Sequence, residues 1–473
     1  MPVKKSSRLE SILRVSLCAL LFLIPLQTVW IYSQPVVNGF VWEFGTMKIY
    51  LTEIILWFSC ILFLFWFWEK LHLYKKKKKI TFSFTKDRAF TMAVGAFIVY
   101  CLISTLWAIH PELALQQALW VMAAGIVFFM LYLGPVPWHQ ASIWFIIGAT
   151  TQGVLGIVQF FTQSVGSTKL MGMGVHHAWE GGSAVLLGES IGRWLRAYGT
   201  FPHPNILGGF LCLSLIISIL FFSSVKRGKS VWDPLFRYTI IGIQLFALFV
   251  TFSKSAWIAF GLWVFSLIAF FLVYYTAKSH KVFAEKAEQF TNFSLFCVCG
   301  IVALVLFFQP LVASRFLGNA PHELRSVSER ISGYAESLHI FSVAPLTGVG
   351  VGNYTVAAMI ASPGAPGWQY QPVHNVILLV FAELGFLGAT LALLILCYFL
   401  VYFFSRVPKK YPEYTLFFLL LCMPYGILLL FDHYLFSSYS GLIFGAVYFG
   451  LVGQYMEHVI HNLSTSTRKK LRK

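Results

Sequence analysis

Long apolar runs separated by short polar or basic segments extend over almost the whole chain. A run of about 20 apolar residues can cross a bilayer as a helix, and lipid leaves no other way for a single segment to pair its backbone groups. The pattern therefore predicts an all-α polytopic membrane protein with about 12 transmembrane helices. The runs cover residues 13–32, 49–68, 89–109, 113–133, 141–161, 206–224, 237–253, 255–276, 293–311, 374–404, 415–431 and 437–455.

Two connections between these runs, residues 162–205 and 312–373, are much longer than the others. Loops of that length are uncommon unless they are functional or disordered, and their aromatic and apolar content argues against disorder. The chain then divides into N-terminal helices 1–5 (1–161), the first long loop, helices 6–9 (206–311), the second long loop, and helices 10–12 with a basic tail (374–473).

Basic residues are concentrated in loops that alternate along the chain, at 75–79, 226–229, 278–286, 406–410 and 468–473. This is the positive-inside pattern, and it predicts cytoplasmic termini and outward-facing long loops. The chain is 58% hydrophobic and 11% charged, so we attribute the net charge of +17 to topology and expect no nucleic-acid partner. The first run is long enough to span and lacks a convincing cleavage site, which favours a helix over a signal peptide.

The second long loop contains apolar residues at spacings of three and four, which predict an amphipathic helix on the outer membrane surface. Arg330 falls at the edge of this apolar stripe, so it could point toward a site or could be a surface arginine that extends to the headgroups. The stripe consists of Leu324, Val327, Ile331, Tyr334, Leu338 and Phe341.

His374 begins a predicted spanning helix, where the positive helix terminus disfavours the cationic imidazole. A neutral imidazole is what a general base needs, although a capping or interface histidine would occupy the same position. Arg196 and Arg330 lie in separate long loops on the same predicted face, and guanidinium groups bind phosphate oxygens bidentately. These residues together predict a site for a phosphate-bearing substrate.

Other polar residues could bind a metal ion or support His374. The outer histidines show no zinc-type spacing and the outer loops contain no Asp-x-Asp pair, so we predict no metal site. Glu383 follows His374 by nine positions, which places it on the opposite side of a straight helix. We therefore expect Glu383 to make a structural hydrogen bond to a neighbouring helix.

Five short motifs occur in a fixed order over residues 190–450. They are Arg-Ala-Tyr-Gly-Thr-Phe-Pro-His-Pro-Asn at 196–205, Thr-Phe-Ser-Lys-Ser-Ala-Trp at 251–257, Ser-Glu-Arg at 328–330, Pro-Leu-Thr-Gly-Val-Gly-Val-Gly-Asn-Tyr at 345–354, and His-Asn at 374–375 followed by Glu-Leu-Gly at 383–385. This ordered set resembles the O-antigen ligase and polymerase superfamily of bacterial membrane glycosyltransferases. Lys254 departs from the family pattern, which often has arginine there, and the first five helices match in topology alone.

The resemblance implies transfer of a preassembled glycan from an undecaprenyl diphosphate carrier to an acceptor hydroxyl, with inversion and without a metal or cofactor. It implies that His374 is the base and that Arg196 and Arg330 bind the diphosphate. Possible substrate contacts are Asn205, Lys254, Asn375 and His433. The expected partners are the lipid-linked glycan donor, a lipid or glycan acceptor, and membrane lipids.

Ligase and polymerase activities both remain open, because the sequence does not reveal the acceptor. A flippase or transporter of lipid-linked oligosaccharides is an alternative of a different class. Transporters usually place their polar residues at mid-membrane and show internal repeats, whereas the polar residues here cluster in two outer loops.

Overall fold

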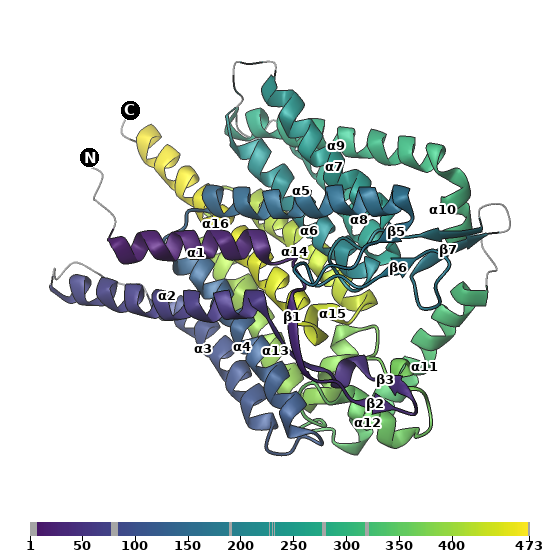
Figure 1. The fold of residues 1–473 in the computed structure, drawn as a ribbon. Coiled ribbons are helices and arrows are strands. Elements are labelled where there is room, and N and C mark those ends of the chain that lie inside the picture. Colours follow the sequence, from purple (N-terminus) through teal and green to yellow (C-terminus); the bar gives the residue numbers. More distant parts are fainter. Residues whose placement is uncertain are drawn as a thin grey trace.

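The computed structural model describes residues 7–76, 84–188, 192–226, 228, 230, 232–276, 281–316 and 321–471. This part of the chain is a helical bundle with a few short strands between the helices, as Figure 1 shows. The basic segments predicted at 75–79, 226–229, 278–286 and 468–473 lie partly outside the described residues, as do the side chains of Leu324 and Val327.

Each of the twelve predicted runs overlaps a long helix. These are α1 (Arg8–Leu23), α2 (Leu51–Lys76), α3 (Phe84–Ser104), α4 (Pro111–Leu133), α5 (Trp138–Thr162), α6 (Pro204–Ser224), α7 (Trp232–Val250), α8 (Lys254–Thr276), α9 (Lys281–Phe307), α13 (Val376–Arg406), α14 (Glu413–Phe431) and α16 (Tyr439–Leu471). Over the described residues, nine of them are long and apolar enough to cross a membrane, and α1, α3 and α16 are not among the nine. The all-α polytopic class is thereby confirmed, while spanning by these three remains a prediction.

The first helix ends at Leu23, so the prediction of a helix to residue 32 is wrong in its second half. Pro25 follows two positions later, and proline cannot continue the hydrogen-bonding pattern of a helix. The chain then forms strand β1 (Val29–Ser33), which pairs antiparallel with β4 (Met47–Tyr50).

Between these strands, β2 (Val36–Val37) pairs with β3 (Phe40–Val41), and a 3-10 turn η1 (Glu43–Gly45) follows. The two-residue turn Asn38-Gly39 has positive φ at both positions, 49° and 83°, as a tight hairpin turn requires. We call residues 29–50 the N-terminal strand layer.

The first long loop also contains short strands. β5 (Ser164–Val165) pairs with β6 (His176–His177), and β7 (Val185–Gly188) pairs with β8 (Gly192–Leu195). The loop ends at α6, in which every residue except Asn205 and Ser224 is buried, so this helix is the centre of the bundle.

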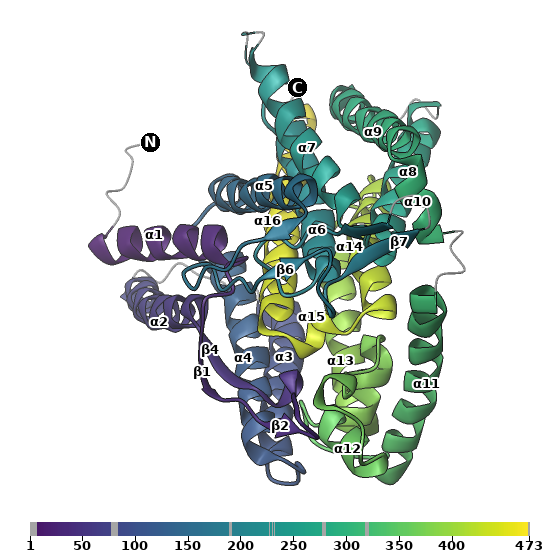
Figure 2. The ribbon, with the colours of Figure 1, turned by 45° about the vertical axis from the view of Figure 1, so that its right-hand side comes forward.

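The second long loop is largely helical, with α10 (Gln309–Phe316), α11 (Pro321–Val343), α12 (Tyr354–Ala361) and a 3-10 turn η2 (Gly367–Gln369). Helix α11 is the predicted amphipathic helix, and it packs along α13 (Figure 2). Its buried face is not the predicted apolar stripe, however. Ser337 and Ile340 are buried, whereas Ile331 and Leu338 are exposed.

Helix α13 is broken at Gly385, which has φ 63° and ψ −166°. The loop before α12, residues 344–353, which we call the glycine-rich loop, fills the break. Phe386 and Leu387 donate their N–H groups to the carbonyls of Pro345 and Leu346 at 2.8 and 3.1 Å. Val349 and Gly350 donate in the opposite direction, to the carbonyls of residues 382 and 383 at 3.1 and 2.9 Å. Irregular backbone within an apolar helix is tolerated only where the protein supplies such partners.

Candidate functional site

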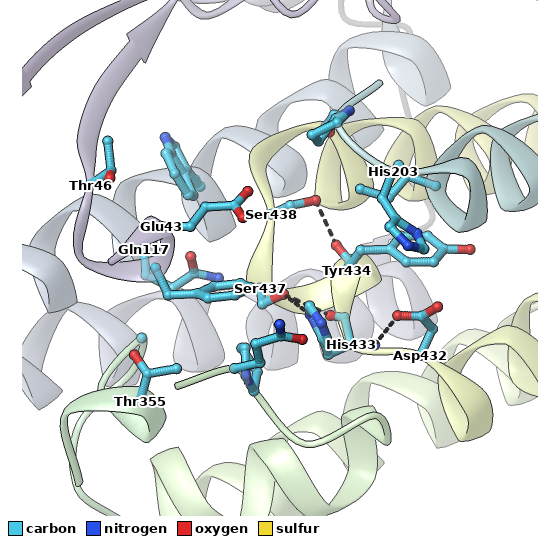
Figure 3. Close-up of a pocket in the computed structure, with 18 of the residues that line it drawn as sticks. Glu43, Thr46, Gln117, His203, Thr355, Asp432, His433, Tyr434, Ser437 and Ser438 are labelled. Carbon is cyan, nitrogen blue, oxygen red and sulfur yellow. Dashed lines mark hydrogen bonds between the residues drawn. The ribbon is translucent and has the colours of Figure 1, made fainter. Parts of the chain in front are cut away.

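A cavity of about 400 Å³ lies where the N-terminal strand layer, α4, the start of α6, the glycine-rich loop and the segment after α14 meet. Figure 3 shows Glu43, Thr46 and Gln117 on one side of it and Asp432 and His433 on the other. The lining thus combines segments that are far apart in the sequence.

Three titratable residues form a cluster on one side of this cavity. His374 directly precedes Asn375, the N-cap of α13, and Asp432-His433 directly follow α14, before the short helix α15 (Tyr434–Ser437). One side-chain nitrogen or oxygen atom from each of His374, Asp432 and His433 lies within 4.8 Å of the other two, and the centres of the two imidazole rings are 5.0 Å apart. Nδ1 of His433 lies 2.7 Å from the Ser437 hydroxyl, and the His433 backbone N–H donates to Oδ1 of Asp432 at 2.9 Å.

A chain of hydrogen bonds connects this cluster to Arg196. The Asn205 amide donates to Oδ2 of Asp432 at 3.0 Å, and Nη2 of Arg196 donates to the Asn205 amide oxygen at 2.7 Å. Nε of Arg196 donates to the carbonyl of Thr251 at 2.7 Å. Nδ1 of His203, the N-cap of α6, accepts the backbone N–H of Asn205 at 3.1 Å. Asn205 therefore lies between a buried cation and a buried carboxylate.

The electrostatic surroundings favour a neutral His374. Burial lowers the pKa of His374 below its ordinary value, and the charge of Arg330 acts in the same direction, while Asp432 and Glu329 act against it. Burial likewise lowers the pKa of His433 to about 3. At neutral pH both imidazoles can accept a proton or a hydrogen bond.

Asp432 remains charged within this cluster. Burial acts to raise its pKa, but His374, His433 and His203 outweigh that effect, together with the hydrogen bond from Asn205, so the pKa lies below its ordinary value. The carboxylate can therefore hold its amide and backbone donors at neutral pH and can stabilise an imidazolium formed beside it.

The two predicted arginines occupy different environments. Arg330, on α11, is partly exposed and close enough to influence both imidazoles. Arg196 is buried, at 5% exposure, behind Asn205. Neither arginine is among the described residues that line the cavity.

Glu383 lines the cavity from α13 and is 3% exposed. Its carboxylate accepts the backbone N–H groups of Gly352 at 2.8 Å and of Tyr354, the first residue of α12, at 3.3 Å. These are structural hydrogen bonds of the kind predicted for it, and they fix the end of the glycine-rich loop against α13.

The structure brings Asn205, His374 and His433 to the cavity, but it places Lys254 and Asn375 elsewhere. Lys254 begins α8 with its ammonium 5.7 Å from the centre of the Phe316 ring. The Asn375 side chain caps α13 by accepting the backbone N–H of Leu378 at 3.1 Å. Neither residue belongs to the described lining of the cavity.

Sequence reasoning did not select Asp432 or the charged residues of the strand layer, Glu43 and Lys48, as site residues. Asp432 had one signal, its position beside His433 in a short connection between two apolar runs. No local signal marked Glu43 and Lys48, because residues 13–32 before them were predicted to form a spanning helix.

His374, Asp432 and His433 also have the ligand types of a metal site. Their remaining contacts fit that role poorly, since both Asp432 oxygens already accept hydrogen bonds and Nδ1 of His433 contacts Ser437. The charge of Arg330 would oppose a bound cation as well. The arrangement suits an anion beside a base, and the absence of a metal remains a prediction.

A family model described as O-Antigen ligase matches residues 239–393, from α7 into α13, a range that includes Arg330 and His374. The match confirms the resemblance found from the motifs. No match was found among curated proteins.

Proposed function

We propose that the chain is a multi-pass glycosyltransferase of the bacterial inner membrane, and the match of residues 239–393 to the O-antigen ligase family supports this proposal. In the proposed reaction a preassembled glycan passes from an undecaprenyl diphosphate carrier to an acceptor hydroxyl on the outer side of that membrane. The observation that carries the proposal is the position of His374, a neutral imidazole at a cavity, next to the cation Arg330 and the carboxylate of Asp432.

His374 acts as the general base in this reaction. It takes the proton of the acceptor hydroxyl, and the acceptor oxygen forms a bond to the anomeric carbon of the donor sugar. The bond between that carbon and the diphosphate oxygen breaks, and undecaprenyl diphosphate leaves with the electron pair. Attack from the side opposite the leaving group inverts the anomeric configuration. Asp432 stabilises the imidazolium that forms on His374.

The arginines stabilise the charge that develops on the diphosphate. Arg330 approaches the cluster from α11, where its partly exposed guanidinium can bind phosphate oxygens bidentately. Arg196 acts from behind Asn205, adding positive charge and holding the amide that bonds to Asp432. Diphosphate is a good leaving group, so the reaction requires neither a general acid nor a metal ion.

Reconstituted glycan transfer tests the proposal. The purified protein in lipid vesicles receives a lipid-linked glycan and a lipid or glycan acceptor, and the glycosylated acceptor and free undecaprenyl diphosphate are quantified. We expect the two products in equal amounts. A lipid acceptor that is glycosylated identifies a ligase, and extension of a second lipid-linked glycan identifies a polymerase. Movement of the donor across the bilayer without any transfer would show a flippase and contradict the proposal.

A further inference from the structure

The side of the cavity that faces the histidine cluster has a different chemical character. It is formed by η1 and β4 from the strand layer, by α4, and by the start of α12. We call this the polar wall, and its members are Glu43, Thr46, Lys48, Gln116, Gln117, Trp120 and Thr355. Most of these side chains are uncharged and combine hydrogen-bond donors with acceptors.

Three members of the polar wall retain hydrogen-bonding capacity after their protein contacts are made. Gln116 uses its amide oxygen to accept the Lys48 backbone N–H at 3.0 Å, and Gln117 uses its amide nitrogen on the carbonyl of Phe436. The opposite end of each amide has no partner among the described residues. Thr355 is 2% exposed, and its hydroxyl has no hydrogen-bond partner in the described part of the chain.

An unsatisfied buried hydroxyl is unfavourable by itself, and native structures seldom retain one without a reason. Thr355 lies in the cavity lining at the N-terminal turn of α12, whose position Glu383 fixes. Its hydroxyl therefore indicates a polar group that the cavity receives from outside the chain.

Charge distinguishes this wall from the place proposed for the diphosphate. The polar wall contains one cation, Lys48, beside one carboxylate, Glu43, so the described residues present no excess positive charge for a phosphate. Trp120 adds an aromatic surface, next to the stacked rings of Tyr50 and Tyr439 at 4.6 Å. Neutral amides, hydroxyls and an aromatic ring match the alternating hydroxyls and apolar C–H faces of a sugar.

The polar wall is also directly connected to the histidine cluster. Gln117 bonds to Phe436 in α15, the helix that begins after His433. The Phe44 ring lies 5.5 Å from the His433 ring. A sugar held against this wall would therefore lie beside the proposed base, within a cavity whose volume is in the range of roughly 300–1,000 Å³ that is typical of ligand sites.

We infer that the polar wall is a sugar-binding subsite, with Gln116, Gln117 and Thr355 hydrogen-bonding the hydroxyls of one sugar ring. The inference rests on the proposed function, because that function makes a glycan the ligand. The sugar comes from the donor glycan or from the acceptor, and both present the same chemistry to the wall. Apart from Thr355, the residues of this subsite lie outside the matched range 239–393.

Binding measurements on the full chain in lipid nanodiscs test the inference without any need for turnover. The probes are undecaprenyl diphosphate, the same carrier bearing one N-acetylhexosamine, and a soluble oligosaccharide of the acceptor. The variants are Thr355→Val, which keeps the side-chain shape, Gln116→Leu, and the two combined. Thr151→Val is the matched control, since Thr151 is exposed on α5 and bonds only within its own helix.

We expect the combined variant to bind a sugar-bearing probe about tenfold more weakly, the loss that two neutral hydrogen bonds produce. Binding of the sugar-free carrier should be unchanged, as should every affinity of the control. Weaker binding of the hexosamine-bearing carrier assigns the subsite to the donor, and weaker binding of the oligosaccharide assigns it to the acceptor.

The inference is overturned if no sugar-bearing probe is weakened in either single variant or the combined one, or if the sugar-free carrier is weakened equally. Selective loss of sugar binding in a protein that transfers no glycan would contradict the proposed function and leave the subsite standing. The single variants, each checked for an unchanged thermal unfolding midpoint, keep the test valid if the combined variant fails to fold.

Discussion

Replacing Gly385 with alanine tests whether the break in α13 holds the site in place. Gly385 has φ 63° and ψ −166°, a backbone conformation that is essentially restricted to glycine. A Cβ atom at this position would lie 2.4 Å from the carbonyl carbon and oxygen of Leu346. Because those atoms belong to the backbone of the glycine-rich loop, the clash can be relieved only if the loop moves away.

The structure sets the size of the effect. Forcing alanine into this conformation costs roughly 1–3 kcal/mol. Movement of the loop also breaks the two hydrogen bonds from Phe386 and Leu387, each worth about 0.5–1.5 kcal/mol. The total, roughly 2–6 kcal/mol, is a large part of the stability of a typical domain, about 5–15 kcal/mol. Glu383 would then lose its alignment with Gly352 and Tyr354.

Thermal unfolding in detergent and glycan transfer in vesicles measure the two consequences. We expect Gly385→Ala to lower the unfolding midpoint. We also expect transfer to fall to less than about a tenth, because a displacement of roughly 1 Å in a site can cost about a hundredfold in rate. Gly261→Ala in α8 is the control. Beyond the neighbouring backbone of α8, no atom of the described residues lies within 4 Å of its added Cβ, and alanine favours helix by roughly 0.5–1 kcal/mol. If Gly385→Ala matched Gly261→Ala in both measurements, the broken helix would have no part in forming the site.

Three further predictions concern charge, pH and topology. Arg330→Ala should lower turnover roughly tenfold to a hundredfold, because a charge-assisted hydrogen bond is worth about 1.5–3 kcal/mol, and lysine should rescue it incompletely. Arg193→Ala is the control, since its side chain bonds to loop carbonyls. Equal losses in both variants would contradict diphosphate binding by Arg330. The transfer rate should fall at acidic pH as His374 becomes protonated, with a midpoint below the ordinary histidine pKa. Arg330→Ala should move this midpoint to higher pH, because it removes a charge that lowers the pKa of His374. An unchanged midpoint would argue against the proximity of Arg330 and His374. In intact cells an impermeant thiol reagent should label Ser183→Cys and not a cysteine at position 77, and the reverse pattern would invert the predicted topology.

The helices could be predicted from sequence because lipid permits few other structures for a long apolar segment. The length of the first apolar run predicted the wrong end for α1, which Pro25 terminates. The Asn38-Gly39 turn then forms a hairpin. Both signals are local and could have been recognised. The buried face of α11 could not be predicted in this way, because the burial of Ser337 and the exposure of Leu338 depend on how the helix packs against α13.

Candidate site residues were found where a local pattern marked them. His374, His433 and Asn205 each lie at the end of an apolar run, and all three reach the cavity. Lys254 and Asn375 had equally clear positions but face other partners, which only the tertiary structure decides. The polar wall was missed for the same reason, since its members come together from elements more than 200 residues apart in sequence, such as Gln116 and Thr355.

The most direct test of the central claim is the turnover of His374→Ala with donor binding measured on the same preparation. If His374 is the base, the rate should fall by roughly two to four orders of magnitude, the usual contribution of positioned proton transfer. Affinity for the lipid-linked donor should stay near that of wild type, because cationic residues and not this imidazole bind the diphosphate. His339→Ala, at an exposed position of α11, should change neither quantity. Retention of most of the turnover by His374→Ala would show that the proton is taken by another group and would contradict the account.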